Sequence, residues 1–137
     1  MHTLEFFQKR GQGHLPGYMG IEILHAAPKH LTARLQIQPH HLAPNGFLHA
    51  ATVIALADTA CGYGCVATLP EGAKNFTTVE LKTNFLGTAR HGAIFCEAVL
   101  AHGGRTTQVW DATVRDEAND KVIALFRCTQ MILYPKD

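Results

Sequence analysis

A single carboxylate interrupts an otherwise apolar stretch of this sequence. Asp58 is the only charged residue between Ala50 and Leu69. Apolar surroundings raise the pKa of a carboxyl group, and such a group is a competent general base when it stays ionised. The alternative is a helix carboxylate that reaches solvent or a structural partner, and the residue alone does not decide between the two.

The start of the same stretch is a second place where chemistry can occur. If the stretch is helical, the first backbone N–H groups after His49 lack intrahelical partners, and the helix dipole makes that end positive. Such an end can stabilise a thioester carbonyl oxygen as it becomes an oxyanion. Asp58 follows His49 by nine residues, which is about 180° of rotation on a helix. One helix therefore cannot aim both groups at one carbon, whereas two antiparallel helices of a dimer could.

Other reactive side chains fit structural roles better. His40 and His41 resemble a metal pair, but no third ligand follows at motif spacing, so we expect no metal. The cysteines form no C-x-x-C pair and are expected to be reduced, with Cys61 and Cys65 as buried core thiols (all four are Cys61, Cys65, Cys96 and Cys128). Gly103-Gly104 predicts a two-residue hairpin turn, after which Arg105 could contact a phosphate.

Composition limits the class of protein. The chain has 137 residues, 47% of them hydrophobic, and a formal net charge of +1. This predicts one globular domain over residues 1–137 and argues against nucleic acid or an anionic membrane as a partner. The N-terminus has no apolar run, so a cytoplasmic location is expected. A bilayer span over residues 50–69 is disfavoured because a central Asp58 costs about 2.5–3.5 kcal/mol.

Hydrophobic periodicity predicts one long helix among strands. A short helix over residues 3–10 is expected, with Thr3 as its N-cap and Gly11 at its end. The long helix covers residues 50–69, and strands are predicted over residues 17–27, 30–38, 76–86, 92–101, 105–115 and 122–133. The order is two strands, the helix, then four strands in a meander. We therefore expect an α+β fold in which an antiparallel sheet wraps the apolar helix.

Residues 45–63 carry the pattern N-G-x-x-H-A-A-x-x-x-x-L-A-D-x-A-x-G-Y. This pattern resembles the hotdog-fold acyl-CoA thioesterases of the phenylacetate-degradation (PaaI-like) type. Three later stretches are similar to that family's third strand, its hairpin and a following turn (residues 77–86, 104–105 and 121–124). The resemblance covers about residues 15–133.

The resemblance implies an antiparallel hotdog sheet around the helix, homodimers with a continuous sheet, and often homotetramers as dimers of dimers. It implies cleavage of an acyl-CoA substrate without metal or cofactor. Asp58 falls on the family's catalytic carboxylate, either as general base for water or as a nucleophile that forms an anhydride. Ala50 falls on a Gly whose N–H polarises the thioester carbonyl, and Thr78 on a Ser or Thr that orients the water or the carboxylate.

The sequence departs from the family at two places near the helix start. Ala50-Ala51 replaces the usual Gly-Gly, which keeps the backbone donor but adds methyl groups beside the acyl pocket. Many members carry an Asn six residues before the motif His, where this chain has Ala43. The asparagine of this chain, Asn45, comes four residues before that His. The residues expected to contact the substrate are Asn45, Gly46, His49 and Arg105.

The sequence thus predicts a hotdog acyl-CoA thioesterase that acts through Asp58 on an aromatic or medium-chain acyl group. A hotdog dehydratase or hydratase is one alternative, and it would use a His with an acid on enoyl- or hydroxyacyl-thioesters. A non-catalytic acyl-CoA-binding protein is the other. A carboxylate beside a thioester argues against it, because binding alone does not need one.

Overall fold

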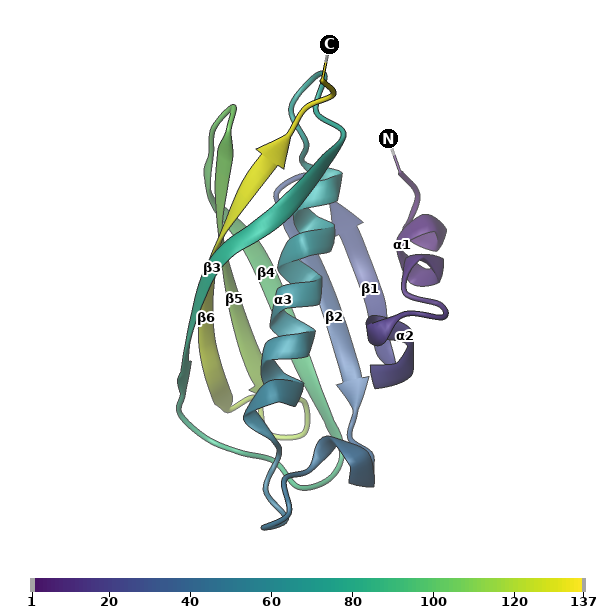
Figure 1. The fold of residues 1–137 in the computed structure, drawn as a ribbon. Coiled ribbons are helices and arrows are strands. Elements are labelled where there is room, and N and C mark those ends of the chain that lie inside the picture. Colours follow the sequence, from purple (N-terminus) through teal and green to yellow (C-terminus); the bar gives the residue numbers. More distant parts are fainter. Residues whose placement is uncertain (1, 137) are drawn as a thin grey trace.

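The computed structural model describes residues 2–136 and consists of one curved antiparallel sheet around one long helix (Figure 1). The helices are α1 (Leu4–Arg10), α2 (Leu15–Met19), the 3-10 turn η1 (Pro39–His41) and α3 (Ala50–Ala67). The strands are β1 (Ile21–Ala27), β2 (His30–Gln36), β3 (Asn75–Phe85), β4 (Ala93–Gly103), β5 (Thr107–Asp116) and β6 (Val122–Leu133). The expected α+β architecture is confirmed.

The strand order in the sheet is β1-β2-β4-β5-β6-β3, with every neighbouring pair antiparallel. Strands β4, β5 and β6 form the predicted meander, but the placement of β3 in that meander was wrong. It pairs with β6 at the edge of the sheet, and the chain then passes below the helix start to reach β4 (Figure 1). Alternation along a strand shows which side chains share a face but not which strand lies next to it.

Two local predictions were also wrong, and backbone hydrogen bonds explain both. Residues 15–19 form α2 and not the start of a strand: Pro16 occupies the first helical turn, and the Gly17 N–H donates to the Gly11 carbonyl at 3.0 Å. The link between β4 and β5 has three residues, 104–106, closed by Gly104 N–H donating to the Thr107 carbonyl at 2.8 Å. The short helix α1 is confirmed, with Thr3 Oγ1 accepting from the Phe6 N–H at 3.2 Å.

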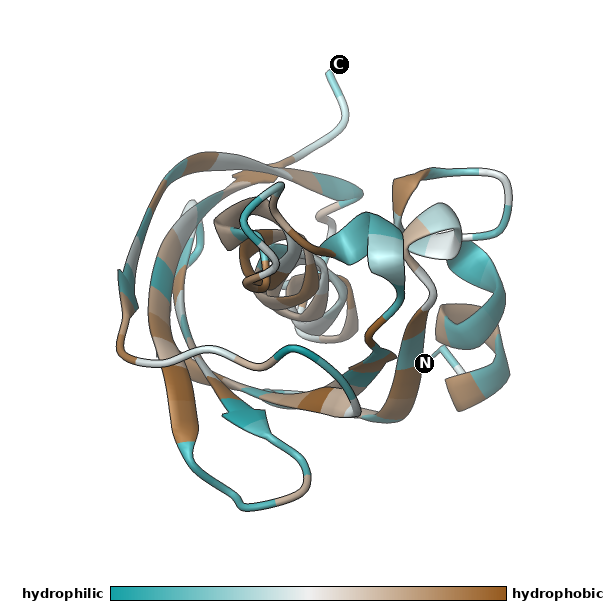
Figure 2. Cartoon of the chain, turned by 90° about the horizontal axis from the view of Figure 1, so that it is seen from below, coloured by the Kyte–Doolittle hydropathy of each residue, from teal (hydrophilic) through white to brown (hydrophobic). Residues whose placement is uncertain are grey.

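Helix α3 begins at Ala50 as predicted and ends at Ala67, where the Thr68 hydroxyl donates to the Gly64 carbonyl at 2.7 Å. Its length and composition would suffice to cross a membrane, but most of the helix is buried inside the sheet. Figure 2 shows the sheet curving around much of this apolar helix when the molecule is viewed along it. The prediction of a core helix is confirmed, and all four cysteines are buried and unpaired.

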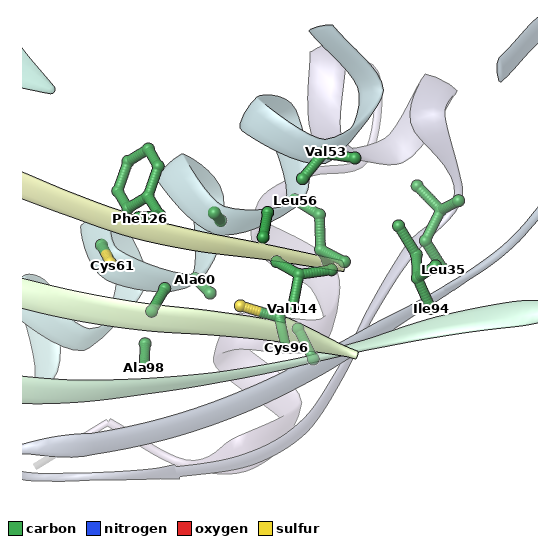
Figure 3. Packing of buried hydrophobic residues seen from close by; sticks show 14 of the residues in the cluster. Leu35, Val53, Leu56, Ala60, Cys61, Ile94, Cys96, Ala98, Val114 and Phe126 are labelled. Atoms are coloured by element: carbon green, nitrogen blue, oxygen red, sulfur yellow. The ribbon is translucent and has the colours of Figure 1, made fainter. Parts of the chain in front are cut away.

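Small residues let α3 lie close to the sheet. Leu56 and Ala60 of the helix pack among Ile94, Cys96 and Val114 from β4 and β5 (Figure 3), and all five are fully buried. These contacts fill the space between helix and strands along most of the helix.

Two glycines mark the closest approach of α3 to the sheet. A Cβ at Gly64 would lie 2.6 Å from the Trp110 ring, and one at Gly62 would lie 2.9 Å from the Phe76 ring. Trp110 is fully buried and its Nε1 donates to Gln108 Oε1 at 2.8 Å, so its ring is fixed.

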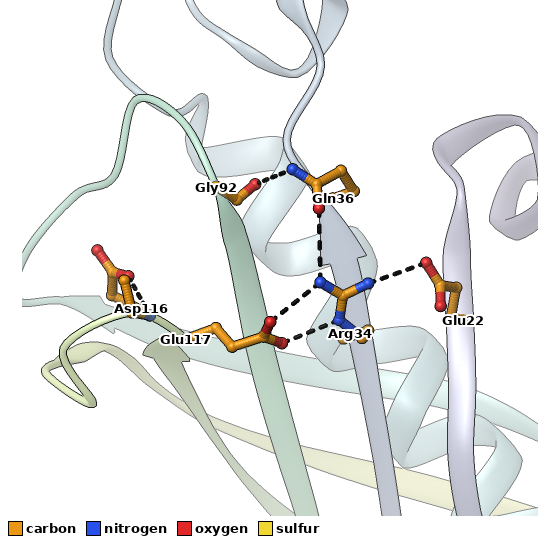
Figure 4. Close-up of polar contacts among 7 residues, drawn as sticks. Glu22, Arg34, Gln36, Gly92, Asp116 and Glu117 are labelled. Carbon is orange, nitrogen blue, oxygen red and sulfur yellow. Dashed lines mark hydrogen bonds and ion pairs between the residues drawn. The ribbon is translucent and has the colours of Figure 1, made fainter.

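On the outer face of the sheet, Arg34 joins three segments of the chain (Figure 4). Its guanidinium makes two hydrogen bonds to the Glu117 carboxylate, at 2.9 and 3.0 Å, and one to Glu22 at 3.2 Å. The side chain of Gln36 donates in turn to the Gly92 carbonyl at 2.9 Å. These bonds tie β1 and β2 to the turn between β5 and β6, and they keep the charges away from the helix.

We predict that Gly64→Ala destabilises the protein by about 1–3 kcal/mol, because the added methyl overlaps the fixed Trp110 ring. Helix propensity alone would make alanine more stable than glycine by about 1 kcal/mol, so a loss of stability would show that the methyl overlaps the ring. Urea unfolding of Gly64→Ala and Gly62→Ala measures the free energy of unfolding of each variant. Phe76 is only partly buried and can move away, so the Gly62 variant should lose less. Equal stability of the Gly64 variant and the parent would contradict the prediction.

Candidate active site

Asp58 lies near the middle of α3 with its carboxylate half-buried. Within residues 2–136 its Oδ1 is enclosed but accepts no hydrogen bond. Burial raises the pKa of Asp58 above its ordinary value, and the hydroxyl of Thr78 partly opposes this. The group is therefore a desolvated carboxylate with free lone pairs, which suits proton abstraction or nucleophilic attack.

The packing of α3 against β3 explains why Thr78 lies opposite Asp58. The two elements run in opposite directions (Figure 1), and the Phe76 ring lies against Gly62. Two residues further along β3 on the same face is Thr78, and one turn back along the helix is Asp58. The structure thus brings these two predicted site residues together.

Gln130 also belongs to this cluster, and sequence reasoning missed it. The Thr78 hydroxyl donates to Gln130 Oε1 at 2.8 Å, and the Gln130 side chain on β6 is fully buried. Gln130 occupies an inward position of a strand whose other inward residues are apolar, such as Phe126 and Ile132. A polar residue at such a position was the signal that could have identified it.

His49 caps the helix. Its Nδ1 accepts a hydrogen bond from the Ala51 N–H at 2.8 Å, which leaves the proton of a neutral ring on Nε2. The Ala50 N–H, in contrast, has no hydrogen-bond partner within residues 2–136, and Ala50 is exposed. Ala50 therefore offers the free donor that the sequence suggested at the positive end of the helix.

The loop before the helix uses Asn45 and Gly46 to make a turn. Asn45 Oδ1 accepts from the Phe47 N–H at 3.2 Å, and Gly46 has φ +88°, a conformation that favours glycine. The Ala43 N–H closes the loop by donating to the Phe47 carbonyl at 2.7 Å. Asn45 thus has a structural role in this chain, and its contact with substrate stays a prediction.

His41 is a structural residue. It is buried, its Nδ1 accepts from the Gln38 N–H at 2.9 Å, and its Nε2 lies 2.8 Å from the Met19 carbonyl oxygen. Both ring nitrogens are engaged, and burial lowers the pKa of this imidazole. The His41 carbonyl accepts from the Thr52 hydroxyl at 2.8 Å, so the residue anchors the helix start.

Arg105 lies at the other end of the molecule. It borders a hollow of about 390 Å³ together with Thr68 and Pro70, and its guanidinium lies over the Tyr134 ring, 5.0 Å from the ring centre. Ala50 and Thr68 are separated by the whole of α3, about 27 Å. Within one chain, the structure therefore does not bring Arg105 and Ala50 together.

Ala50 and Asp58 are separated as well, by about 12 Å along the helix axis.

A second hollow, of about 300 Å³, lies at the helix start between α2, η1 and α3 (Leu15, Met19, His40, Leu42, His49, Ala51, Thr52 and Ala55). A third hollow, of about 420 Å³, lies over the Asp111–Arg127 ion pair. That hollow is on the outer face of the sheet, away from Asp58.

Comparisons with known proteins agree with this geometry. A family model described as "Thioesterase superfamily" matches residues 45–123. The 1,4-dihydroxy-2-naphthoyl-CoA hydrolases of Listeria monocytogenes and Escherichia coli are each 28% identical to this chain. The first match covers 81% of this chain and 89% of that protein, and the second covers 84% of both. A thioesterase of Haemophilus influenzae superposes with a TM-score of 0.90 at 25% identity, over 98% of this chain and 92% of that one.

We predict that Asp58→Asn raises the melting temperature at pH 7. The folded-state pKa of Asp58 is raised, so the ionised carboxylate destabilises the fold at pH values above that pKa. The advantage of asparagine should shrink as the pH falls through the folded-state pKa and disappear below about pH 3, where the carboxyl is protonated in both the folded and the unfolded state. Thermal unfolding of both proteins from about pH 2.5 to 8 is the measurement. A variant that is less stable by the same amount at every pH would show that burial does not disfavour the charge.

Proposed function

Because the chain belongs to the thioesterase superfamily and is a hotdog thioester hydrolase, we propose that it cleaves acyl-CoA to a free acid and CoA with Asp58 as the reacting carboxylate. The observation that carries this proposal is the desolvated Asp58 carboxylate, which has an unpaired oxygen and lies beside the Thr78 hydroxyl. Buried oxygens without a hydrogen-bond partner are uncommon in folded proteins, and this one belongs to an ionisable group that can take a proton or attack a carbonyl carbon.

Two chemical routes use the same carboxylate. As a general base, Asp58 takes a proton from water while the water oxygen attacks the thioester carbon, and the CoA thiolate leaves. As a nucleophile, Asp58 attacks that carbon itself and forms a mixed anhydride, which water then hydrolyses. Both routes need the ionised form, and both develop negative charge on the thioester oxygen.

The Ala50 N–H is the proposed donor to that oxygen, because it is unpaired and the helix dipole favours negative charge there. Its distance from Asp58 on the same helix means that a second copy must supply one of the two groups. Strand β3 supports a homodimer, because it is an edge strand of 11 residues with exposed apolar side chains (Val79, Leu81 and Phe85). Pairing β3 with its copy would continue the sheet and cover these residues. Pairs of such dimers would make the expected homotetramer.

The acyl group and the CoA phosphates can be assigned to the hollow at the helix start and the hollow beside Arg105. The apolar hollow at the helix start adjoins Ala51 and has the volume of a small binding pocket, so it suits an aromatic or medium-chain acyl group. The names of the naphthoyl-CoA hydrolases favour the aromatic class. Arg105, at the opposite end of the helix, would meet the phosphates of a CoA bound between two antiparallel copies.

We predict that Asp58→Asn folds and dimerises normally but loses turnover of acyl-CoA by about 10²–10⁴-fold, the usual contribution of a positioned base. Release of free CoA thiol from phenylacetyl-CoA, a hydroxybenzoyl-CoA and a medium-chain acyl-CoA measures it. Near-normal kcat in an intact dimer would remove Asp58 from the mechanism. Tight acyl-CoA binding without turnover by the parent and the variant alike would favour a binding protein.

A second prediction tests the two-chain site with Ala50→Pro. Proline is tolerated at the first helical position, and the extended backbone of His49, with φ −69° and ψ 136°, is the conformation required before proline. The variant should keep its fold while losing one oxyanion donor, which costs about 10²–10³ in kcat.

Co-refolding Ala50→Pro with the separately inactive Asp58→Ala should restore about a quarter of normal activity. Random pairing makes about half of the dimers hybrids, and one of the two sites in each hybrid carries neither change. Each variant refolded alone serves as the control. Hybrid dimers confirmed by mass spectrometry that remain inactive would show that both groups serve one chain's site, or that Ala50 is not the donor.

A further inference from the structure

Two polar groups on either side of Thr78 are poorly satisfied. Asp58 Oδ1 has no hydrogen-bond partner within residues 2–136. The fully buried amide NH₂ of Gln130 finds only Cys128 Sγ, at 3.4 Å, which is a weak acceptor. The Thr78 hydroxyl lies close enough to Asp58 to lower the pKa of that carboxyl, but its single hydrogen is directed to Gln130 Oε1 at 2.8 Å and cannot serve both acceptors. Buried polar groups in folded proteins are rarely left this way.

Rotating the Gln130 amide improves the hydrogen bonding of Gln130 itself and of Asp58, Thr78 and Cys128. The oxygen and the NH₂ of a side-chain amide have nearly the same size, so turning the Gln130 amide by 180° changes no packing. Its Nε2 would then lie beside Thr78 Oγ1 and donate to it, which frees the Thr78 hydroxyl hydrogen for Asp58. The amide oxygen would then face Cys128 and could accept from its thiol.

We propose that Gln130 is a positioning residue: its amide donates a hydrogen bond to Thr78 Oγ1, and the Thr78 hydroxyl donates to the Asp58 carboxylate. This inference rests on the proposed role of Asp58 and adds a residue from β6 to the site. Hydrogen bonds to a charged acceptor are stronger than neutral ones, and a chain of donors polarises each successive bond. The chain of donors therefore favours the ionised form of Asp58 against the effect of burial and fixes its orientation on a helix that otherwise offers it no polar contact.

Few other titratable groups face Asp58. The buried thiol of Cys61 on α3 lies close to Asp58, and the thiol of Cys128 on β6 lies beside Cys61. Burial raises the pKa of Cys61 well above its ordinary value, so that thiol is neutral at the pH values used below. The charged side chains of β3 and β6 lie together on the outer face of the sheet (Glu80, Lys82 and Arg127). In the proposed dimer the His49 imidazole of the second copy would also approach Asp58, but neither it nor the groups above change between the variants. A difference in the titration of Asp58 between two variants therefore reports its hydroxyl neighbour.

Carboxyl ¹³C NMR of the substrate-free protein between pH 3 and 8 tests the proposal, together with the pH profile of kcat/KM. Thr78→Val should raise the pKa of Asp58 by about one unit, since it removes a hydrogen bond to the charged form. Thr78→Ser should restore the parent value. Gln130→Leu should also raise the pKa of Asp58, by about a few tenths of a unit, because the Thr78 hydroxyl would no longer be polarised by the Gln130 amide.

The opposite amide orientation predicts opposite results, which makes the test decisive. In that orientation Gln130→Leu would free the Thr78 hydroxyl for Asp58 and lower its pKa, and Thr78→Val would leave it unchanged. Either result overturns the proposal. The double variant Thr78→Val/Gln130→Leu should match Thr78→Val alone, because Gln130 acts only through the hydroxyl. Additive shifts would also overturn it.

Two matched controls separate positioning from general destabilisation. Thr83→Val changes the same residue type on the same face of β3, and Gln108→Leu removes the buried glutamine that pairs with Gln130 across β5 and β6. Neither should move the pKa of Asp58, although Gln108→Leu should lower stability. If Thr78→Val and Gln130→Leu behave as these controls do, Gln130 is structural only and the proposal fails.

The NMR titration also distinguishes this inference from the proposed function, because it observes the carboxyl without turnover. Shifts of the expected sign with an unchanged kcat/KM profile would support the chain of donors and remove Asp58 from catalysis. Absent shifts in a protein that Asp58→Asn inactivates would leave Asp58 catalytic and overturn the role of Gln130. If Gln130→Leu does not fold, the valine and serine variants of Thr78 still decide whether its hydroxyl serves Asp58.

Discussion

The close contact between one apolar helix and the sheet around it is the constraint on which the other features depend. An 18-residue helix with few polar side chains must be covered along most of its length. The sheet can approach closely enough only because the facing positions are small, and at Gly64 the backbone nearly touches the Trp110 ring. The curvature of the sheet, the fixed Trp110 and the buried thiols follow from that contact.

The same contact creates the chemical environment of Asp58. Packing excludes water from one side of the carboxylate, and the small neighbours that permit the packing supply no cation to neutralise it. The charged side chains of the sheet lie on its outer face, where Arg34 binds Glu117 and Arg127 binds Asp111. Only hydroxyl and amide groups remain to stabilise the charge, which gives Thr78 and Gln130 more influence on Asp58 than neutral residues have at an exposed site.

Local signals made part of this structure predictable. The starts of α1 after Thr3 and of α3 at Ala50 were predictable because capping residues act over only a few positions. Asp58 was predictable as a site residue because it is the one charge in an apolar stretch of sequence. The edge position of β3 was mispredicted because it depends on pairing between distant segments, and α2 was mispredicted because a local backbone hydrogen bond from Gly17 to Gly11 turns the chain there. Thr78 was identified only through the resemblance to a family. Gln130 was missed because its partner Thr78 lies 52 positions away in the sequence.

Strand β3 links the folding constraint to catalysis. Its inner face includes Leu81 and Phe85, which remain 40% and 46% exposed, because one sheet does not cover that side of the helix. A long apolar edge strand promotes association with other chains unless something pairs with it. In the proposed dimer a second copy would cover the strand. It would also run antiparallel to the first, so that the Ala50 end of one helix approaches Asp58 of the other. The incomplete cover of the single chain would then be a requirement of the site: a helix fully enclosed by its own sheet would leave no room for a substrate between its carboxylate and an oxyanion donor.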